Sequence, residues 1–139
     1  MELHTADYRC AEVVARFFAK HIQASHEGIS NLEFLCPDGA KAACRRQQVI
    51  IAAEEHKLVG ALRFYRRKTS NSASLYQFAL NERFRGNGVI AQMLQKIDVE
   101  YIEANCPTKS TFNAYYEKTG WQCVQESRGM YIWQYRLIS

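Results

Sequence analysis

Apolar and polar positions alternate along this chain with two periods, one helical and one extended. Apolar side chains recur every three or four residues between positions 8 and 24, which predicts an amphipathic helix with Asp7 as its N-cap. Residues 2–5 before this helix predict a first edge strand. The segment 25–40 mixes small, polar and apolar residues, so we expect a loop plus a short helix or turn, ending at a turn over residues 37–39.

Three extended runs follow in the middle of the chain. Residues 49–53 are apolar and largely β-branched, residues 54–57 are polar, and residues 58–65 resume the strand pattern, which indicates an antiparallel hairpin. A second polar turn at 69–72 precedes the third run, residues 75–80. The middle of the chain therefore predicts a three-stranded meander.

A basic turn that contains Gly86 and Gly88 connects this third strand to a helix. The helix is predicted from apolar residues at helical spacing, namely Val89, Met93, Leu94 and Ile97. The start of a helix leaves backbone N–H groups without partners, and the helix dipole favours negative charge there. The turn therefore predicts a phosphate-binding site.

The last third of the chain predicts a strand, a short helix and a hairpin. We assign residues 99–105 to a strand from their alternation, with a helix that continues to Glu103 as the alternative. Residues 111–118 predict a short helix that ends before Gly120. Two strands then follow, joined by a turn; the strands are residues 121–125 and 130–138, and the turn is Ser127-Arg128-Gly129. Together these elements predict one α+β domain over residues 1–139, with a mixed, mostly antiparallel sheet flanked by helices.

Composition places this domain among ordinary globular proteins. Of the 139 residues, 47% are hydrophobic and 23% are charged. The five cysteines and four histidines show no ligand spacing, so we expect no metal site and reduced thiols. No apolar run is long enough to cross a bilayer and the N-terminus lacks a signal-peptide pattern, so we expect a soluble cytoplasmic protein without membrane contact. The net charge of +4 gathers at Arg45-Arg46 and residues 66–68, which leaves nucleic-acid association as a weaker alternative.

Two motifs resemble those of the GNAT superfamily of N-acetyltransferases. Residues 83–90, Arg-Phe-Arg-Gly-Asn-Gly-Val-Ile, resemble the family's acetyl-CoA pyrophosphate loop. Residues 115–121, Tyr-Tyr-Glu-Lys-Thr-Gly-Trp, resemble its C-terminal Tyr-Glu-Lys-x-Gly-aromatic signature. Their order and separation also match, and the predicted elements fit the family fold from about residue 2 to 138. The resemblance implies acetyl-CoA as the donor co-substrate and a primary amine, on a small molecule or a protein, as the acceptor.

The resemblance also implies roles for individual residues. The backbone from Arg85 to Ile90 would hold the pyrophosphate, the strand at Phe78-Ala79-Leu80 would splay from its neighbour and pair with pantetheine, and an N–H near Leu80 would stabilise the tetrahedral oxyanion. Tyr116 would donate a proton to the departing thiolate, whereas Tyr115 is assigned to the core. The implied catalytic residues are Tyr116 and Leu80. The implied cofactor-binding residues are Phe78, Ala79, Leu80, Arg83, Arg85, Gly86, Asn87, Gly88, Val89, Ile90 and Tyr116.

The sequence departs from the family pattern in two motif positions. Ile90 stands where the family usually has glycine or alanine, and its branched side chain is expected to disturb the helix start or the pantetheine groove. Lys109 stands where an asparagine is common, seven residues before the tyrosine, and Asn105 or Asn113 are the substitutes.

The general base is the least defined part of the predicted site. Many family members use a glutamate on the third strand of the meander, and Ser74 occupies that position here. Glu82 is expected to be solvated, so we expect a water chain or a carboxylate from elsewhere, such as Glu33. Ile90 and the missing base together keep a second hypothesis open, a CoA-binding domain without turnover. The sequence also leaves open whether the protein forms a homodimer.

Overall fold

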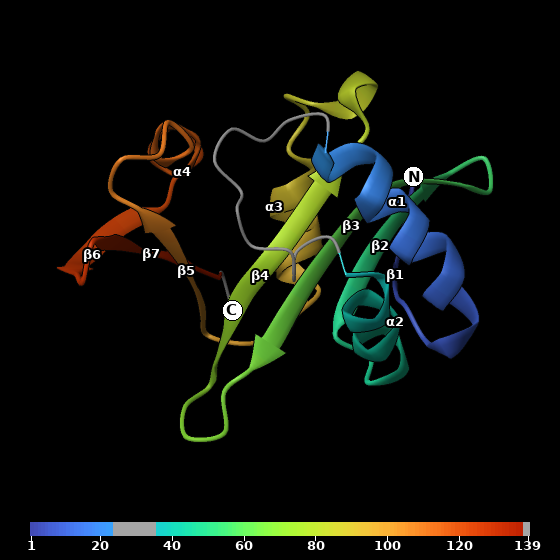
Figure 1. The fold of residues 1–139 in the computed structure, drawn as a ribbon, viewed down its shortest axis with the longest axis horizontal. Helices are drawn as coiled ribbons and strands as arrows, with labels where there is room; N and C mark the ends of the chain where they lie inside the picture. Colours follow the sequence, from blue (N-terminus) through green and yellow to red (C-terminus); the bar gives the residue numbers. More distant parts are fainter. Residues whose placement is uncertain (24–35, 138–139) are drawn as a thin grey trace.

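The computed structural model describes residues 1–23 and 36–137, and its described strands form one seven-stranded sheet (Figure 1). The spatial order is β1-β2-β3-β4-β5-β7-β6, and every neighbouring pair is antiparallel except β4 and β5. The strands are β1 Glu2–Thr5, β2 Val49–Glu54, β3 Lys57–Arg66, β4 Ser72–Leu80, β5 Tyr101–Pro107, β6 Gln122–Ser127 and β7 Met130–Arg136. This is the mixed, mostly antiparallel sheet that the sequence predicts.

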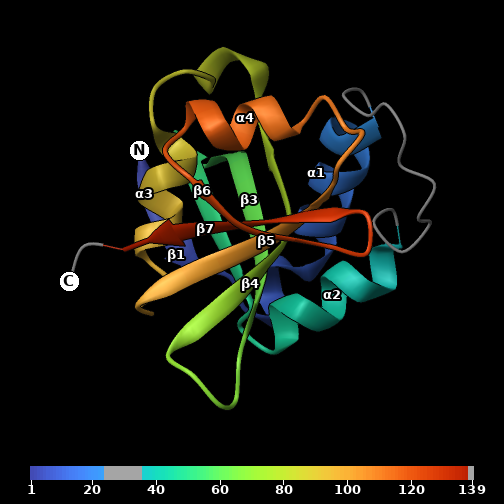
Figure 2. The same ribbon diagram turned by 90° about the vertical axis from the view of Figure 1, so that its left-hand side faces the viewer.

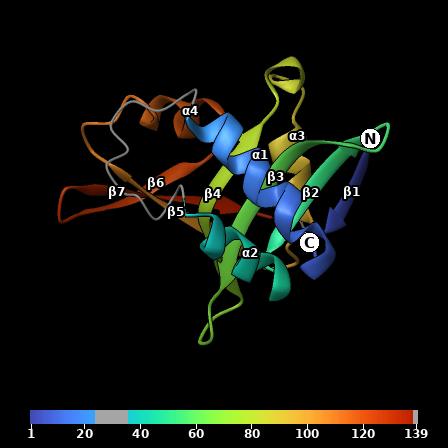
Figure 3. The same ribbon diagram turned by 45° about the vertical axis from the view of Figure 1, so that its right-hand side comes forward.

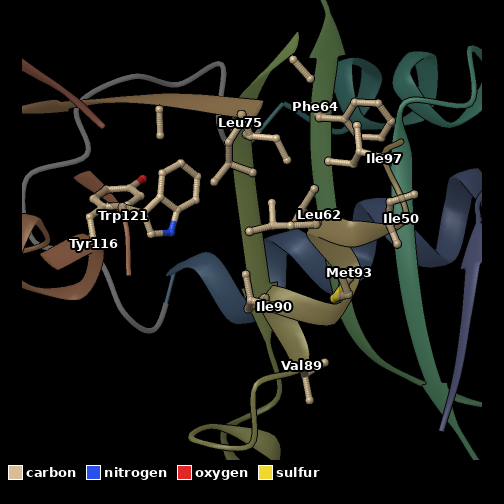
Figure 4. Close-up of a cluster of buried hydrophobic side chains, with 14 of the residues drawn as sticks. Ile50, Leu62, Phe64, Leu75, Val89, Ile90, Met93, Ile97, Tyr116 and Trp121 are labelled. Atoms are coloured by element: carbon tan, nitrogen blue, oxygen red, sulfur yellow. The ribbon is translucent and has the colours of Figure 1, made fainter. Parts of the chain in front are cut away.

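Helices cover both faces of the sheet (Figures 2 and 3). The helices are α1 Ala11–Gln23, α2 Pro37–Arg45, α3 Val89–Gln95 and α4 Asn113–Lys118, with 3₁₀ turns η1 Tyr8–Cys10 and η3 Glu82–Phe84. Helices α1 and α2 lie on one face, whereas α3 lies on the other, and α4 lies beside the β5–β7 half of the sheet. Each face buries its own apolar core, and Figure 4 shows the one on the α3 side. None of the described helices is long and apolar enough to cross a bilayer.

The N-terminal helix follows its prediction, whereas the segment after it does not. The backbone N–H of Arg9 donates to the Asp7 carboxylate at 2.9 Å, so Asp7 caps the η1 turn from which α1 continues. The prediction of a turn over residues 37–39 is wrong, because these residues form the first turn of α2. Proline is accommodated in a first helical turn, where its missing N–H costs nothing. Residues 25–35 of the predicted loop and short helix or turn lie outside the described residues.

The strand predicted near residue 100 is confirmed, and the alternative of a helix that continues to Glu103 is wrong. Strand β5 begins two residues later than predicted and continues to Pro107, which pairs with Met130 of β7. Proline lacks a backbone donor, and it is tolerated here because the N–H of the next residue, Thr108, faces β7 and donates to the Gly129 carbonyl at 3.0 Å, so the Pro107 nitrogen faces the opposite edge, beyond the last pair with β4.

The β2–β3 turn supports a prediction about stability. Glu55 and His56 adopt φ angles of 50° and 66°, a conformation that glycine and asparagine adopt at lower cost. We expect the double change Glu55→Asn, His56→Gly to raise the free energy of unfolding by about 0.5–1 kcal/mol, because a left-handed backbone strains ordinary residues. Urea denaturation measures the change. Arg128→Asn is the comparison variant: Arg128 also has a positive φ angle, 53°, but Gly129 already occupies the second position of the β6–β7 turn, so only one strained residue is relieved. We expect a smaller gain there, and no gain in either variant would contradict the explanation.

Candidate active site

Strands β4 and β5 separate after a short parallel contact. Three residue pairs join them, namely Ser72 with Tyr101, Ala73 with Ile102 and Ser74 with Glu103. Beyond this contact β5 pairs with β7 alone and β4 pairs with β3 alone, and Figure 1 shows the two strands diverging. Among the described residues, the β4 edge over residues 75–80 therefore has no strand partner. We call this stretch the open edge of β4.

A β-bulge in β4 accounts for the divergence. The register between β3 and β4 steps from Arg63 opposite Gln77 to Phe64 opposite Leu75, so Tyr76 is an extra residue in β4. A bulge bends its strand and increases the local twist. This bulge lies two residues after Ser74, the last residue of β4 that pairs with β5.

The open edge presents backbone N–H groups at its far end. The N–H of Asn81 donates to the Val59 carbonyl at 2.7 Å, so it points toward β3. Successive residues of a strand alternate in direction, and the N–H groups of Leu80 and Phe78 therefore point to the open edge. The predicted splay is present, and Leu80 has the orientation that its proposed role requires.

The turn after β4 is ordered by side-chain and backbone bonds. The Asn81 side chain accepts a hydrogen bond from the N–H of Arg83 at 3.0 Å, which starts η3. Gly86 and Gly88 have φ angles of 82° and 73°, a region that favours glycine. The side chains of Arg83 and Arg85 are exposed at this turn.

Several N–H groups of this turn remain available to an anion. The N–H of Arg85 donates to the Glu82 carbonyl at 3.2 Å, and the next backbone bond comes from Gln92 to Gly88 at 3.1 Å. Residues 86–91 lie between these two donors, and in the part of the chain that the structure describes their N–H groups have no backbone acceptor. Consecutive free N–H groups beside cationic side chains are the usual protein contacts of a phosphate.

Ile90 leaves the start of helix α3 directly after the glycine turn, whereas its predicted effect on the pantetheine groove stays a prediction. Helix α3 begins at Val89, directly after Gly88. The side chain of Ile90 is 9% exposed and lies in the core with Leu62 and Met93 (Figure 4). Its branched side chain therefore fills the core on the α3 side.

Tyr116 lies in an aromatic cluster on α4. Its side chain is 6% exposed, and its ring is 5.1 Å from that of Trp121 and 5.7 Å from that of Trp133 (Figure 4). Burial raises the pKa of the Tyr116 phenol above its ordinary value, with smaller contributions from Cys106 and Tyr115. Tyr116 therefore keeps its proton well beyond neutral pH.

Phe78 connects this cluster to the open edge of β4. The Phe78 ring lies 5.7 Å from Phe112 and 5.4 Å from Tyr115, and Tyr115 is 5.6 Å from Tyr116. Tyr115 is partly buried against the same core, as predicted, and burial raises its pKa to about 12. These ring contacts place α4, and with it Tyr116, beside the strand that carries Leu80.

Comparison with known protein families assigns the chain to the family that its two sequence motifs resemble. A model of the acetyltransferase (GNAT) family matches residues 15–121, more than half of the chain. The chain belongs to the GNAT acetyltransferase family. No curated protein matches the sequence significantly.

Solved GNAT structures share the fold of this chain at low sequence identity. A GNAT-family acetyltransferase from Listeria monocytogenes 4b F2365 has a TM-score of 0.79 and 15% identity, over 98% of this chain and 94% of that one. The PaiA N-acetyltransferase from Thermoplasma acidophilum, in complex with coenzyme A, has a TM-score of 0.75 and 13% identity, over 97% and 98%. An N-acetylglutamate synthase from Neisseria gonorrhoeae, complexed with coenzyme A and N-acetyl-glutamate, has a TM-score of 0.67 and 13% identity, over 99% of this chain and 35% of that one.

Asn113 holds the start of α4 in this GNAT chain. Its amide nitrogen donates to the carbonyls of Pro107 at 2.8 Å and Ser110 at 2.9 Å. Its amide oxygen accepts a hydrogen bond from the Trp133 indole at 2.9 Å. Asn105, the other substitute weighed from the sequence, is exposed. Asn113 therefore ties the helix that carries Tyr116 to β5 and β7.

The candidates for a general base are separated by the structure. Ser74, at the family's glutamate position, accepts a hydrogen bond from the Arg67 guanidinium at 3.3 Å. Arg67 also forms an ion pair of 2.8 Å with Glu103, which lies opposite Ser74 on β5. Glu82 is exposed, as expected, and Glu33 lies outside the described residues. A carboxylate is therefore present beside the Ser74 position, but it is already paired with a cation.

Proposed function

We propose that this GNAT protein transfers an acetyl group from acetyl-CoA to a primary amine by direct attack through a tetrahedral intermediate. One observation carries the proposal: the open edge of β4 runs from beside α4, which bears Tyr116, to the glycine turn at residues 85–90. The turn offers free N–H groups for a pyrophosphate, and the edge offers N–H groups for an extended amide chain. Coenzyme A, which is bound in two of the solved relatives, has both parts.

The residues of the site fit the successive parts of the co-substrate. Residues 85–90 hold the pyrophosphate, and Arg83 or Arg85 adds charge-assisted hydrogen bonds to it. Backbone groups of residues 78–80 pair with the pantetheine as an added strand would. Acetyl-CoA supplies the thioester that the amine attacks.

The reaction requires three proton movements. An alkylamine has a pKa of about 10.4, so it loses a proton before it attacks, and that proton passes to water or to a carboxylate. The new C–N bond places negative charge on the former carbonyl oxygen, which the Leu80 N–H stabilises. The C–S bond then breaks, and Tyr116 donates its proton to the departing thiolate, whose reference pKa is about 8.5. The attacking nitrogen loses its second proton as the amide forms, and this proton returns to the Tyr116 phenolate through water. Burial keeps the Tyr116 phenol protonated at neutral pH, and therefore available as a hydrogen-bond donor to the sulfur, although the raised pKa makes it a weaker acid than free tyrosine.

The acceptors of solved relatives do not identify the acceptor of this chain. These relatives include a ribosomal-protein-S5-alanine acetyltransferase and an N-acetylglutamate synthase, whose names indicate different classes of amine acceptor. The proposed acceptor is therefore a primary amine. The cytoplasmic location, the single-domain organisation and the oligomeric state stay predictions.

Thiol release tests the proposal. The protein is incubated with acetyl-CoA and a panel of aminoglycosides, polyamines, amino acids and lysine peptides, and free CoA thiol is measured with a disulfide dye. We expect release above the hydrolysis background with at least one class of amine. Saturable acetyl-CoA binding without release for any class would contradict the enzyme and support a CoA-binding module.

A further inference from the structure

Arg63 is a buried cation without a carboxylate partner among the described residues. Its side chain is 5% exposed, and its Nε atom has no hydrogen-bond partner in the described part of the chain. The Nη1 atom donates to the Gln77 amide oxygen at 3.1 Å, and Nη2 donates to the Tyr65 hydroxyl. The guanidinium also lies over the Tyr76 ring, 4.2 Å from its centroid.

These neutral contacts stabilise the guanidinium but leave its charge in place. An aromatic face attracts a cation, and amide and phenol oxygens accept its hydrogen bonds. A buried charge nevertheless costs free energy unless an opposite charge accompanies it. Arginine presents a rigid fork of donors that matches a carboxylate. A buried arginine with a spare donor is therefore suited to an anion that arrives with a ligand.

The first turn of α2 adds a second feature that favours an anion. Gly39 lies against the guanidinium, and a Cβ atom there would come within 3.2 Å of Nη1 of Arg63. Within the described residues, the N-cap residue Cys36 makes no side-chain capping bond, so no cap satisfies the N–H groups of Asp38 and Gly39. The positive end of a helix and a buried guanidinium thus meet at one place. Asp38 in the same turn is exposed.

This place lies close to the proposed reaction centre. Arg63 pairs with Gln77, and Gln77 precedes Leu80 by three residues on β4, which is about 10 Å along a strand. Arg63 follows Leu62 of the α3-side core, so its side chain points to the opposite face, which α1 and α2 cover. An anion bound there would lie within the length of one small molecule of the Leu80 N–H.

We propose that Arg63 binds the carboxylate of the acceptor, and that the acceptor is an amine of the amino-acid type. Tyr65, Tyr76 and Gln77 hold the guanidinium in position for this contact. The carboxylate would fix one end of the acceptor and leave its amine directed toward the open edge of β4. This inference rests on the proposed function, because it assigns the acceptor class of the same site.

Paired acceptors test the inference in the wild-type protein. Each amino acid that releases thiol is compared with its carboxamide, which keeps the amine and lacks the negative charge. We expect kcat/KM to be about 10–100 times higher for the acid, the range of a hydrogen bond to a charged group. Equal values, or a preference for the carboxamide or for polyamines, would overturn the inference while leaving the acetyltransferase activity intact.

Two variants test whether the preference for the acid over the carboxamide depends on Arg63. Arg63→Gln is expected to lose the preference for the acid and to retain activity on the carboxamide. Arg66→Gln removes the same charge from an exposed position on the same strand and is expected to keep the preference. If Arg63→Gln does not fold, Arg63→Lys keeps the charge, and an unchanged preference in it would contradict a role for the guanidinium fork.

Calorimetry distinguishes failure of the inference from failure of the proposed function. Amino acids and their carboxamides are titrated into the protein loaded with CoA. Binding of the acids that is lost in Arg63→Gln would support the carboxylate site even if no amine releases thiol, in which case the proposed activity fails. Absence of any difference between acid and carboxamide would overturn the site by itself.

Discussion

Replacing Tyr116 with phenylalanine is expected to lower kcat by about 100-fold to 1,000-fold, the contribution of a positioned general acid. The change removes only the hydroxyl, so the ring contacts with Phe112, Trp121 and Trp133 remain. We therefore expect the KM for acetyl-CoA and the melting temperature to change little. Steady-state kinetics and thermal unfolding measure the three quantities.

Tyr115→Phe is the matched control for this prediction. It removes the same hydroxyl from the neighbouring residue, whose ring is stacked on Phe112 at 5.1 Å. We expect kcat close to wild type. Equal losses in the two variants, or a Tyr116→Phe enzyme with wild-type kcat, would exclude Tyr116 as the proton donor.

The raised pKa of Tyr116 also predicts the direction in which activity changes with pH. A group whose pKa is raised keeps its proton at every pH below that value, and it stops acting as an acid only above it. Activity should therefore rise with pH as the amine loses its proton, without a falling limb from Tyr116 below about pH 10, the reference pKa of tyrosine. A falling limb near neutral pH that disappears in Tyr116→Phe would contradict this assignment.

Replacing Gly88 with glutamate is expected to abolish acetyl-CoA binding. A side chain at φ 73° strains the backbone by about 1–2 kcal/mol. The added carboxylate also places negative charge in the turn that holds the pyrophosphate, where it repels the phosphates. We expect the rise in melting temperature that acetyl-CoA gives the wild type to disappear.

Gly129→Glu separates the backbone effect from the charge effect on binding. Gly129 has a φ angle of 77° and, like Gly88, no atom of the described residues within 4 Å of an added Cβ, but it lies in the β6–β7 turn. Both variants should lose similar stability, whereas only Gly88→Glu should lose the acetyl-CoA shift. An unchanged shift in Gly88→Glu would exclude the glycine turn as the pyrophosphate site.

Local sequence signals predict the elements whose conformation is set by neighbouring residues. The β2–β3 hairpin follows from a polar break between two apolar runs, and the glycine turn follows from Gly86 and Gly88 before a helical pattern. Helix α2 was missed because Pro37-Asp38-Gly39 is typical of a turn, and its helical form depends on burial of Ala40, Ala43 and Cys44 beneath it. Tertiary packing decides such cases over local propensity.

The sequence likewise predicts some features of the functional site, whereas others depend on the fold. The motifs at residues 83–90 and 115–121 are contiguous, so the resemblance could name Gly88 and Tyr116 from the sequence. The bulge at Tyr76 depends on the register between β3 and β4, which no local pattern encodes. Arg63 is equally hidden, because an arginine in a strand is usually exposed and only the fold shows that this one is buried.

A crystal structure with bound coenzyme A tests the central claim most directly. We expect the pyrophosphate against the N–H groups of residues 85–90 and the pantetheine along the open edge of β4. The thiol should then lie between the Leu80 N–H and the Tyr116 hydroxyl. A cofactor bound elsewhere, or one whose thiol lies out of hydrogen-bond reach of Tyr116, would contradict the account.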